Sequence, residues 1–428
     1  MTIIDFITQG VVRRQFSRAM RFNGSQAPAL PQAEYPRPRL LYLHVPFCEQ
    51  LCPYCSFHRV PFQADLTREY FSALRKELAL YHALGYDFNG IYVGGGTPTV
   101  MADELVQVLL LARSLFSIKE ISVETNPDHL TDDRIKMLLE AGVNRLSVGV
   151  QSFDDGLLML MDRYEKYGSG REIAARLKAI QGTFETLNAD MIFNFPTQSE
   201  EILLWDLEVL RKLSLDQVTY YPLMVSHATR KRVEQKLGKV NFHRERLFYR
   251  MILEALLKDY RLSSAWCFSR KKSMIDEYIV DYEEYAGLGS GSIGYLDGVC
   301  YANTFHIPEY IAEINKGNLP IMASRHFSLR ERIRYDFLMQ LFGTRLYRRR
   351  LRGKYGKGWW RPIWLPAAFF FLSGRTRQRG GWWELTREGY YTWVVMMREF
   401  FTAVNNFRDY CRRGKIGESD EGYGQRKS

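Results

Sequence analysis

Three cysteines share one short segment of the chain. Cys48, Cys52 and Cys55 form a C-x3-C-x2-C pattern within HVPFCEQLCPYCSFHR, directly after the β-rich run 40–45. Three thiolates at this spacing can each bind one corner of a cubane iron–sulfur cluster, which ordinarily takes four cysteines. One iron then keeps an open coordination position, which is typical of a catalytic metal site rather than a structural one. The motif therefore predicts a 4Fe-4S cluster that takes part in chemistry.

The same three cysteines also fit simpler interpretations. They could bind zinc, with His44 or His58 as the fourth ligand, or they could be buried free thiols. The six cysteines of the chain are too few and too unevenly spaced for a disulfide scaffold, so the group of three favours metal binding in a reducing compartment. The other three lack the spacing for a second cluster and are expected to be buried thiols: Cys267, Cys300 and Cys411.

Short β-rich runs alternate with longer segments that fit helices from residue 39 onward. The runs cover residues 40–45, 90–93, 120–124, 145–150, 189–195 and 217–222, and the segments between them include 67–85 and 200–213. This alternation predicts a parallel sheet covered by helices, and six such units favour a complete or partial barrel. Parallel barrels carry their active sites at the carboxyl ends of the strands, and the cysteine loop follows such an end.

The alternation fades beyond about residue 240. Residues 243–259, 327–342 and 390–413 have helical patterns, whereas the glycine-dense stretch 285–304 must turn sharply. We therefore expect an α/β fold, a complete or partial parallel (β/α) barrel, followed by a mainly helical C-terminal region.

The segment LYLHVPFCEQLCPYCSF resembles the start of the radical S-adenosylmethionine (SAM) core in the oxygen-independent coproporphyrinogen III oxidase family. The resemblance extends from about residue 39 to about residue 340. It implies a barrel of the radical SAM type, with a 4Fe-4S cluster on the three cysteines and SAM bound to the open iron. An electron, delivered by a donor such as flavodoxin or ferredoxin, would then break a carbon–sulfur bond of SAM and release an adenosyl radical.

The resemblance also implies which residues contact SAM. Tyr54 matches an aromatic position near the adenine, the glycine run matches the segment that holds the methionyl amino group, and Asp190 lies near the start of the run 189–195. A carboxylate can hold ribose hydroxyls, and an arginine can pair with the methionyl carboxylate. Taken one at a time, such polar residues also fit solvated surface positions, and Asp190 fits a turn cap. The expected SAM-binding residues are Tyr54, Gly95, Gly96, Thr97, Glu124, Gln151, Arg163 and Asp190.

One departure from the family pattern affects the choice of substrate. Coproporphyrinogen oxidases usually carry another cysteine two residues after the third, where this chain has Phe57. Phenylalanine at that place resembles the heme-chaperone and methyltransferase branches. We expect a class C methyltransferase that binds two SAM molecules and methylates a lipophilic quinone ring, as in menaquinone methylation. The alternatives act on a tetrapyrrole: coproporphyrinogen oxidation, heme trafficking with His44 or His58 as a ligand, and anaerobic heme breakdown.

Charge and aromatic residues suggest contact with a membrane surface. The net charge is +11, and residues 345–361 hold eight basic residues and no acidic one, beside the aromatic run 359–372. Tryptophan favours the membrane–water interface and arginine favours anionic lipid, although these aromatic residues could instead fill a core. No stretch of about 18 residues is apolar throughout, and no nucleic-acid-reading module is present. We expect a cytoplasmic protein that contacts the inner face of the membrane and binds no nucleic acid.

These observations suggest five regions along the chain. An amphipathic N-terminal extension with a proline-rich linker comes first, and the radical SAM core follows. A family-specific, substrate-facing region, a basic and aromatic C-terminal region and a disordered tail complete the chain. The expected bounds are residues 1–38, 39–240, 241–340, 341–416 and 417–428.

Overall fold

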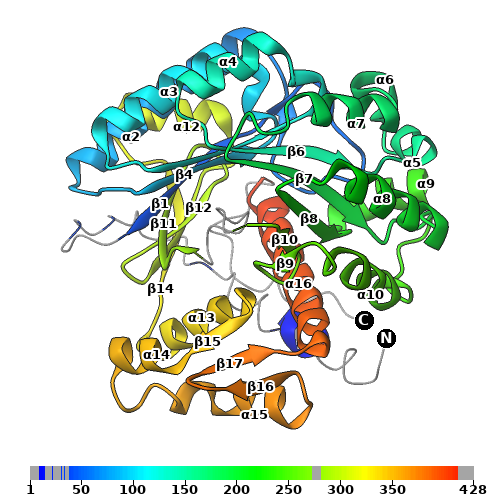
Figure 1. The fold of residues 1–428 in the computed structure, drawn as a ribbon. Helices are drawn as coiled ribbons and strands as arrows, with labels where there is room; N and C mark the ends of the chain where they lie inside the picture. Colours follow the sequence, from blue (N-terminus) through cyan, green and yellow to red (C-terminus); the bar gives the residue numbers. More distant parts are fainter. Residues whose placement is uncertain are drawn as a thin grey trace.

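The structure is a computed structural model that describes residues 9–14, 22, 30, 33, 38–271 and 281–412. A twelve-stranded sheet forms its centre (Figure 1). The six middle strands run parallel, each beside the next along the chain. They are β1 (Arg39–Val45), β4 (Gly90–Gly95), β5 (Glu120–Thr125), β6 (Arg145–Gln151), β7 (Thr186–Phe193) and β8 (Gln217–Pro222).

The two flanks of this sheet do not pair with each other. β11 (Glu284–Leu288) lies parallel to β1 and is followed outward by three antiparallel strands, β12 (Ile293–Leu296), β13 (Val299–Asn303) and β14 (Ile321–His326). The other flank carries the antiparallel strands β10 (Cys267–Ser269) and β9 (Arg261–Leu262). The α/β prediction is confirmed, and the barrel is the partial, open form with a mixed sheet.

The glycine-dense stretch 285–304 contains three strands, which the sequence analysis did not predict. Its glycines serve the turn between β11 and β12, where Gly289 and Gly291 have φ of 93° and 79°. A Cβ at Gly289 would lie 2.5 Å from the carbonyl oxygen of His44, so only glycine fits. Residues with high β propensity pair across the strands, as Tyr285 does with Tyr295.

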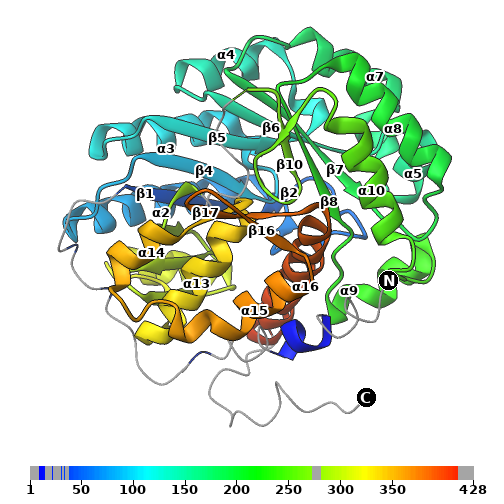
Figure 2. The ribbon, with the colours of Figure 1, turned by 60° about the horizontal axis from the view of Figure 1, so that its bottom comes forward.

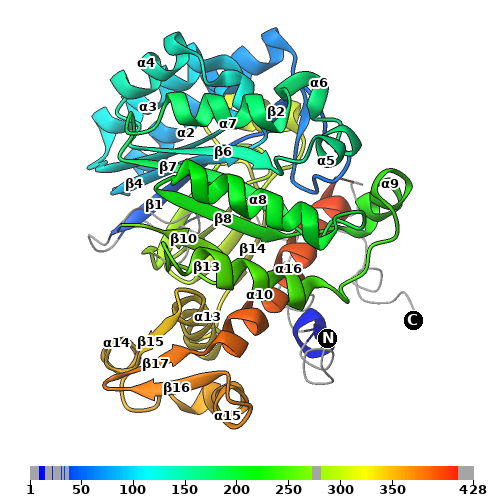
Figure 3. The same ribbon diagram turned by 45° about the vertical axis from the view of Figure 1, so that its right-hand side comes forward.

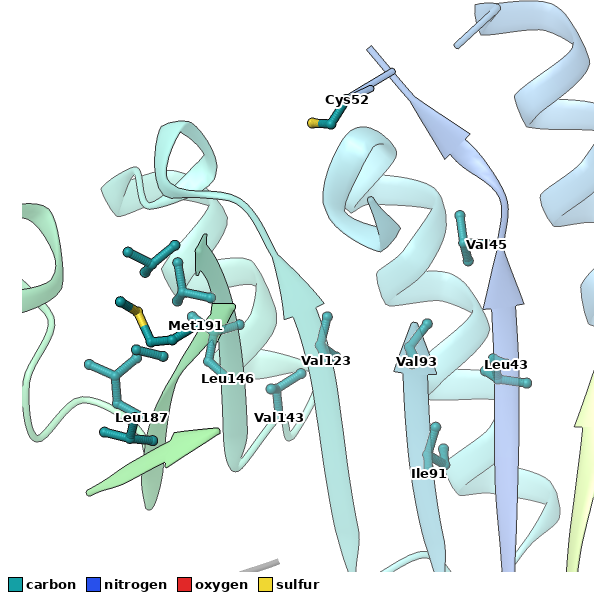
Figure 4. Packing of buried hydrophobic residues seen from close by; sticks show 14 of the residues in the cluster. Leu43, Val45, Cys52, Ile91, Val93, Val123, Val143, Leu146, Leu187 and Met191 are labelled. Carbon is teal, nitrogen blue, oxygen red and sulfur yellow. The ribbon is translucent and has the colours of Figure 1, made fainter. Parts of the chain in front are cut away.

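Helices cover the outer face of the sheet (Figures 1 and 3). α2 shows why, because its buried residues Tyr70, Leu74 and Leu78 recur at helical spacing and face the strands. On the strands, Leu43, Val45, Ile91, Val93 and Val123 pack into the main core (Figure 4). The covering helices include α2 (Ala64–Ala83), α3 (Ala102–Leu115), α4 (Asp132–Glu140), α7 (Gly170–Ala179), α8 (Glu200–Leu213), α10 (Glu245–Leu256) and α12 (Ile307–Asn315).

Short elements follow the strand ends where the site lies. The cysteine loop begins in β2 (Phe47–Cys48), which pairs with β3 (Val60–Pro61). The loops after the other strands contain η1 (Pro98–Met101), η2 (Pro127–His129), α5 (Asp155–Leu160), α6 (Tyr164–Tyr167) and α9 (His227–Leu237).

The C-terminal region is mainly helical, as predicted, and adds a small antiparallel sheet in the order β15-β17-β16. Its last helix, α16, runs beneath the concave side of the main sheet (Figure 1). The elements are α13 (Leu329–Phe342), β15 (Arg345–Tyr347), α14 (Arg348–Tyr355), η3 (Arg361–Ile363), α15 (Trp364–Leu372), β16 (Thr376–Arg379), β17 (Trp382–Leu385) and α16 (Arg387–Cys411).

The aromatic run 359–372 divides between core and surface. Trp359 and Phe370 are buried in a second hydrophobic core around Trp393, so the interfacial role expected of Trp359 is wrong. Trp360 and Trp364, one helical turn apart, are 54% and 56% exposed. Within the described residues, no helix is both long enough and apolar enough to span a membrane.

The expected helices are present, and all but one of them have shifted ends. The segment 200–213 coincides with α8, whereas 67–85, 243–259, 327–342 and 390–413 correspond to α2, α10, α13 and α16. Residues 9–14 are helical, and Arg13 donates a 2.7 Å hydrogen bond to Glu399 of α16. Most of the expected N-terminal extension and linker, and all of the tail 417–428, lie outside the described residues.

Candidate functional site

The three cysteines lie beyond the carboxyl end of β1, on a loop that is closed at its base. The amide of Phe62 donates to the carbonyl of Cys48 at 2.9 Å. Arg59 donates to the carbonyls of Cys52 and Cys55, at 3.0 Å for Cys55. Figure 4 shows Cys52 past the arrowheads of the neighbouring strands. The sequence did not single out Arg59, whose two hydrogen bonds stabilise the cysteine loop.

The donor set fits a cluster better than zinc. Four tetrahedral ligands of zinc place their sulfurs about 3.8 Å apart, given Zn–S bonds of about 2.3 Å. In this structure the three cysteine sulfurs do not all lie within 4.8 Å of one another, so they are too far apart to share one zinc ion. Of the two histidines considered as a fourth zinc ligand, His44 uses both ring nitrogens, since its Nδ1 bonds to the Tyr42 hydroxyl at 2.9 Å and its Nε2 to the His58 carbonyl at 3.0 Å. His58 keeps a buried Nδ1 without a hydrogen-bond partner, so the separation of the sulfurs is what argues against zinc. Burial raises the pKa of Cys48 to about 12, so bound iron would be needed to hold this thiolate.

A chain of hydrogen bonds joins the cysteine loop to the ends of β4 and β5. The Thr97 hydroxyl donates to Cys48 Sγ at 3.6 Å, and Asn126 Nδ2 donates to the Thr97 hydroxyl at 2.9 Å. Arg163 then donates from Nη2 to Asn126 Oδ1 at 3.3 Å and from Nη1 to Cys52 Sγ at 3.6 Å. The structure thus brings Thr97 and Arg163 to the cysteines, as expected. Asn126 was missed, and its position after β5 was the only available signal.

Arg163 is the cation of this network. It is buried, donates to the Gly149 carbonyl at 2.5 Å and stacks over the Tyr167 ring at 4.1 Å. Burial alone would lower the pKa of Arg163, but Tyr54, Cys52 and Tyr167 together raise it. Its Nε is buried and has no hydrogen-bond partner. A charged donor with a spare N–H suits a carboxylate ligand.

The glycine run after β4 approaches the cysteine loop closely. The Gly96 amide donates to the Val45 carbonyl at 2.8 Å, and a Cβ at Gly96 would lie 2.6 Å from the Phe47 carbonyl oxygen. Gly95 has φ of +117°, and a Cβ there would lie 2.6 Å from the His44 ring. Side chains at these positions would push the β4 loop away from the cysteines, so the geometry agrees with the expected backbone cradle.

Glu124 and Asp190 place two carboxylates on the concave side. Glu124 accepts hydrogen bonds from the Tyr92 hydroxyl at 2.9 Å and the Gly95 amide at 3.2 Å. Burial, and then the Asp190 charge, raise the pKa of Glu124 to about 7, and burial raises that of Asp190 to about 6. Because the Asp190 charge contributes to the raised pKa of Glu124, the two carboxyl groups lie within electrostatic range of each other.

Asp190 does not occupy the start of a strand as expected. β7 begins at Thr186, so Asp190 lies in mid-strand beside Gly149 of β6. It accepts hydrogen bonds from Ser147 at 2.8 Å and from Asn188 at 2.9 Å, and it caps no turn. The sequence predicts a β-rich run that begins at residue 189, with Thr186, Leu187 and Asn188 in the preceding loop, whereas these three residues belong to β7.

Gln151 and Tyr54 complete the predicted set. Gln151 has φ of 75° at an irregularity in the β6–β7 pairing, which turns its side chain away from the regular alternation. Tyr54 is buried and packs edge-to-face on Phe195 at 5.7 Å. Apart from Asp190, the predicted cluster and SAM residues therefore lie at or just beyond the carboxyl ends of the parallel strands.

Comparison with known proteins agrees with this arrangement. Residues 42–225 match the family model described as the radical SAM superfamily. The chain is 31% identical over 288 residues to the heme chaperone HemW of Lactococcus lactis, covering 64% of this chain and 74% of that protein. It is 27% identical over 311 residues to an anaerobilin synthase of Escherichia coli O157:H7, covering 68% of each chain. In structure it is similar to coproporphyrinogen III oxidase (HemN) of Escherichia coli, with TM-score 0.75, 20% identity, and coverage of 89% and 95% of the two chains.

These relatives overturn the expected substrate. Menaquinone methylation is wrong, because the relatives in sequence are named for heme and for anaerobilin rather than for a quinone. The expectation rested on Phe57 and on the basic, aromatic C-terminal region. Phenylalanine at position 57 resembles the heme-chaperone branch as well as the methyltransferase branch, so Phe57 does not distinguish between them.

Proposed function

Because the chain belongs to the radical SAM superfamily, and within it to the family that resembles coproporphyrinogen III oxidase, we propose that it is a radical SAM enzyme that acts on a tetrapyrrole. The observation that carries this proposal is the position of Arg163. Its guanidinium contacts Cys52 Sγ on one side and keeps a buried, unpartnered Nε on the other. One side chain therefore lies against the cluster ligands and is free to pair with the SAM carboxylate.

The chain's own residues would bind and orient the cofactors. A 4Fe-4S cluster on Cys48, Cys52 and Cys55 would supply the electron that cleaves SAM. Arg163 would pair with the methionyl carboxylate, and the Gly95–Gly96 backbone would hold the amino group. The electron itself would come from a flavodoxin or ferredoxin.

The carboxylates have a separate task in this proposal. Glu124 and Asp190 would accept hydrogen bonds from ribose hydroxyls, which are uncharged donors. Burial disfavours both charges, and hydroxyl donors would compensate for that cost. These residues account for one SAM molecule.

The choice of a tetrapyrrole rests on the relatives, whose names refer to heme and to coproporphyrinogen. A catalytic role can be tested directly with reconstituted, reduced protein supplied with coproporphyrinogen III or heme. We expect 5′-deoxyadenosine to form at the rate at which one of these two compounds is consumed. Both quantities can be measured by mass spectrometry. If neither compound is consumed while SAM is cleaved, tetrapyrrole chemistry is wrong.

Heme trafficking is the second candidate, and Phe57 favours it. This residue is 51% exposed and stands where oxidases carry an extra cysteine. Of the two candidate heme ligands, His44 already uses both ring nitrogens, whereas Nδ1 of His58 is buried and has no hydrogen-bond partner. Tight one-to-one heme binding without turnover would favour this candidate over catalysis.

The exposed aromatic residues of the C-terminal region support surface contact with a membrane. Trp364, Leu365 and Leu372 are exposed on α15, and Trp360 is exposed just before η3. The helix α15 lies at the front of Figure 2. Basic residues of α14 lie nearby in sequence, so an anionic bilayer would meet both charge and aromatic groups. This contact would be peripheral.

A further inference from the structure

A basic cavity of about 600 Å³ opens beside the cluster loop. Its walls come from that loop, from α9 and from the end of α16, which lie near one another in Figure 3. Small-molecule sites commonly have volumes of about 300–1,000 Å³. The cavity has five cationic side chains and one carboxylate: Arg59, Lys231, Arg232, Arg408, Arg412 and Asp409.

Hydrogen bonds hold the three walls together. The hydroxyls of Ser56 and Thr229 are 2.8 Å apart, which joins the cluster loop to α9. Arg232 Nε donates to the Pro53 carbonyl at 3.0 Å. The His227 amide donates to Asn406 Oδ1 at 3.0 Å and joins α9 to α16. The cavity is therefore a built feature rather than a gap between mobile parts.

The deepest cations have unused donors. Arg59 and Arg408 are only 8% and 4% exposed, yet Nε and Nη1 of Arg59 and Nη1 of Arg408 have no hydrogen-bond partner. Burial lowers the pKa of Arg412, and the charge of Arg408 lowers it further. Unpaired buried donors and crowded like charges both cost free energy. An anionic ligand would relieve both.

The rest of the lining is apolar on the cluster side. Leu51 and Phe57 are exposed there and flank Cys55. A ligand with an apolar ring and anionic arms would match this division, with the ring toward the cluster loop and the arms toward the arginines. Carboxylates are the partners that arginine binds with two parallel hydrogen bonds.

Building on the proposed function, we propose that this cavity binds the propionate carboxylates of the tetrapyrrole through Arg408, Arg412 and Arg232. The C-terminal helix α16 then contributes directly to substrate recognition. Arg59 would join the substrate carboxylates to the cluster loop, because its remaining nitrogen already binds that loop.

The test compares the equilibrium binding of coproporphyrin III and its tetramethyl ester, by porphyrin fluorescence, to the full chain with its cluster. We expect Arg412→Gln and Arg232→Gln each to weaken binding of the free acid about tenfold, as loss of a charged hydrogen bond implies. Asp409→Asn should tighten it, because it removes the cavity's one carboxylate. The ester should bind the wild type weakly and be insensitive to Arg412→Gln. Arg349→Gln, on exposed α14, is the matched control and should change nothing.

The outcomes separate the two proposals. If the wild type binds the free acid and every arginine variant binds it equally well at normal iron content, the cavity assignment is wrong and the proposed function survives. If the wild type binds neither porphyrin nor heme, the proposed function itself fails. If the arginine variants slow only the reduction of the cluster by an acidic flavodoxin, the cavity serves the electron donor and the assignment is overturned.

Discussion

Replacing Arg163 with glutamine removes the cation that touches both the cluster ligands and the expected SAM carboxylate. The structure gives this guanidinium three protein acceptors, which are Cys52 Sγ, Asn126 Oδ1 and the Gly149 carbonyl. The buried and unpartnered Nε remains for a ligand. A hydrogen bond to a charged group contributes about 1.5–3 kcal/mol. We therefore expect the dissociation constant of SAM to rise about ten- to a hundred-fold.

The assay is anaerobic titration of SAM into reconstituted protein by calorimetry, with iron content measured on the same samples. Arg163→Lys keeps a charge but not the fork of donors, so its affinity should fall between those of the wild type and the glutamine variant. Arg171→Gln, on the exposed side of α7, is the matched control. Wild-type SAM affinity in Arg163→Gln at full iron content would refute the reasoning.

Four further predictions follow from the described contacts. Alanine at Cys48, Cys52 or Cys55 should abolish the visible absorption of a cluster containing about four irons, whereas alanine at Cys267, Cys300 and Cys411 together should leave the iron content intact; retained iron in the first set would contradict the assignment. Burial raises the pKa of Glu124 from 4.5 to about 7, so its contribution to stability is present below about pH 4.5 and is lost as the pH rises through 7. Glu124→Gln should therefore raise the melting temperature of cluster-free protein more at pH 8 than at pH 5, and an equal change at both pH values would contradict this. Arg398 and Glu245 form a buried ion pair between α16 and α10, so Glu245→Ala should lower the free energy of unfolding by about 3–5 kcal/mol in urea, with Glu254→Ala on the exposed side of the same helix as control. Trp360→Ser with Trp364→Ser should reduce co-sedimentation with anionic vesicles at low salt, whereas the exposed Trp205→Ser on α8 should not; equal effects of both would remove the specific membrane contact.

Local patterns in the sequence were enough to predict the strand–helix alternation. Thr97, Glu124 and Arg163 were named from the family resemblance, and their contacts with SAM stay predictions. The positions of strand starts were less predictable. Asp190 lies in mid-strand because Thr186, Leu187 and Asn188 pair with β6, and pairing with a neighbour is not a local property.

The sequence by itself determined the cluster motif and the α/β class, because both depend on residue types at short spacing. The expected cofactor contacts came from the family resemblance and stay predictions. Tertiary structure decided which aromatic residues are exposed, since Trp359 and Trp360 are adjacent in sequence but face core and surface. It also decided that Asn126 links Thr97 to Arg163. The basic cavity depends on it entirely, because Arg59, Arg232 and Arg412 come from three distant segments. These side chains come together only when α9 and α16 pack beside the cluster loop, and no periodicity along the chain predicts that packing.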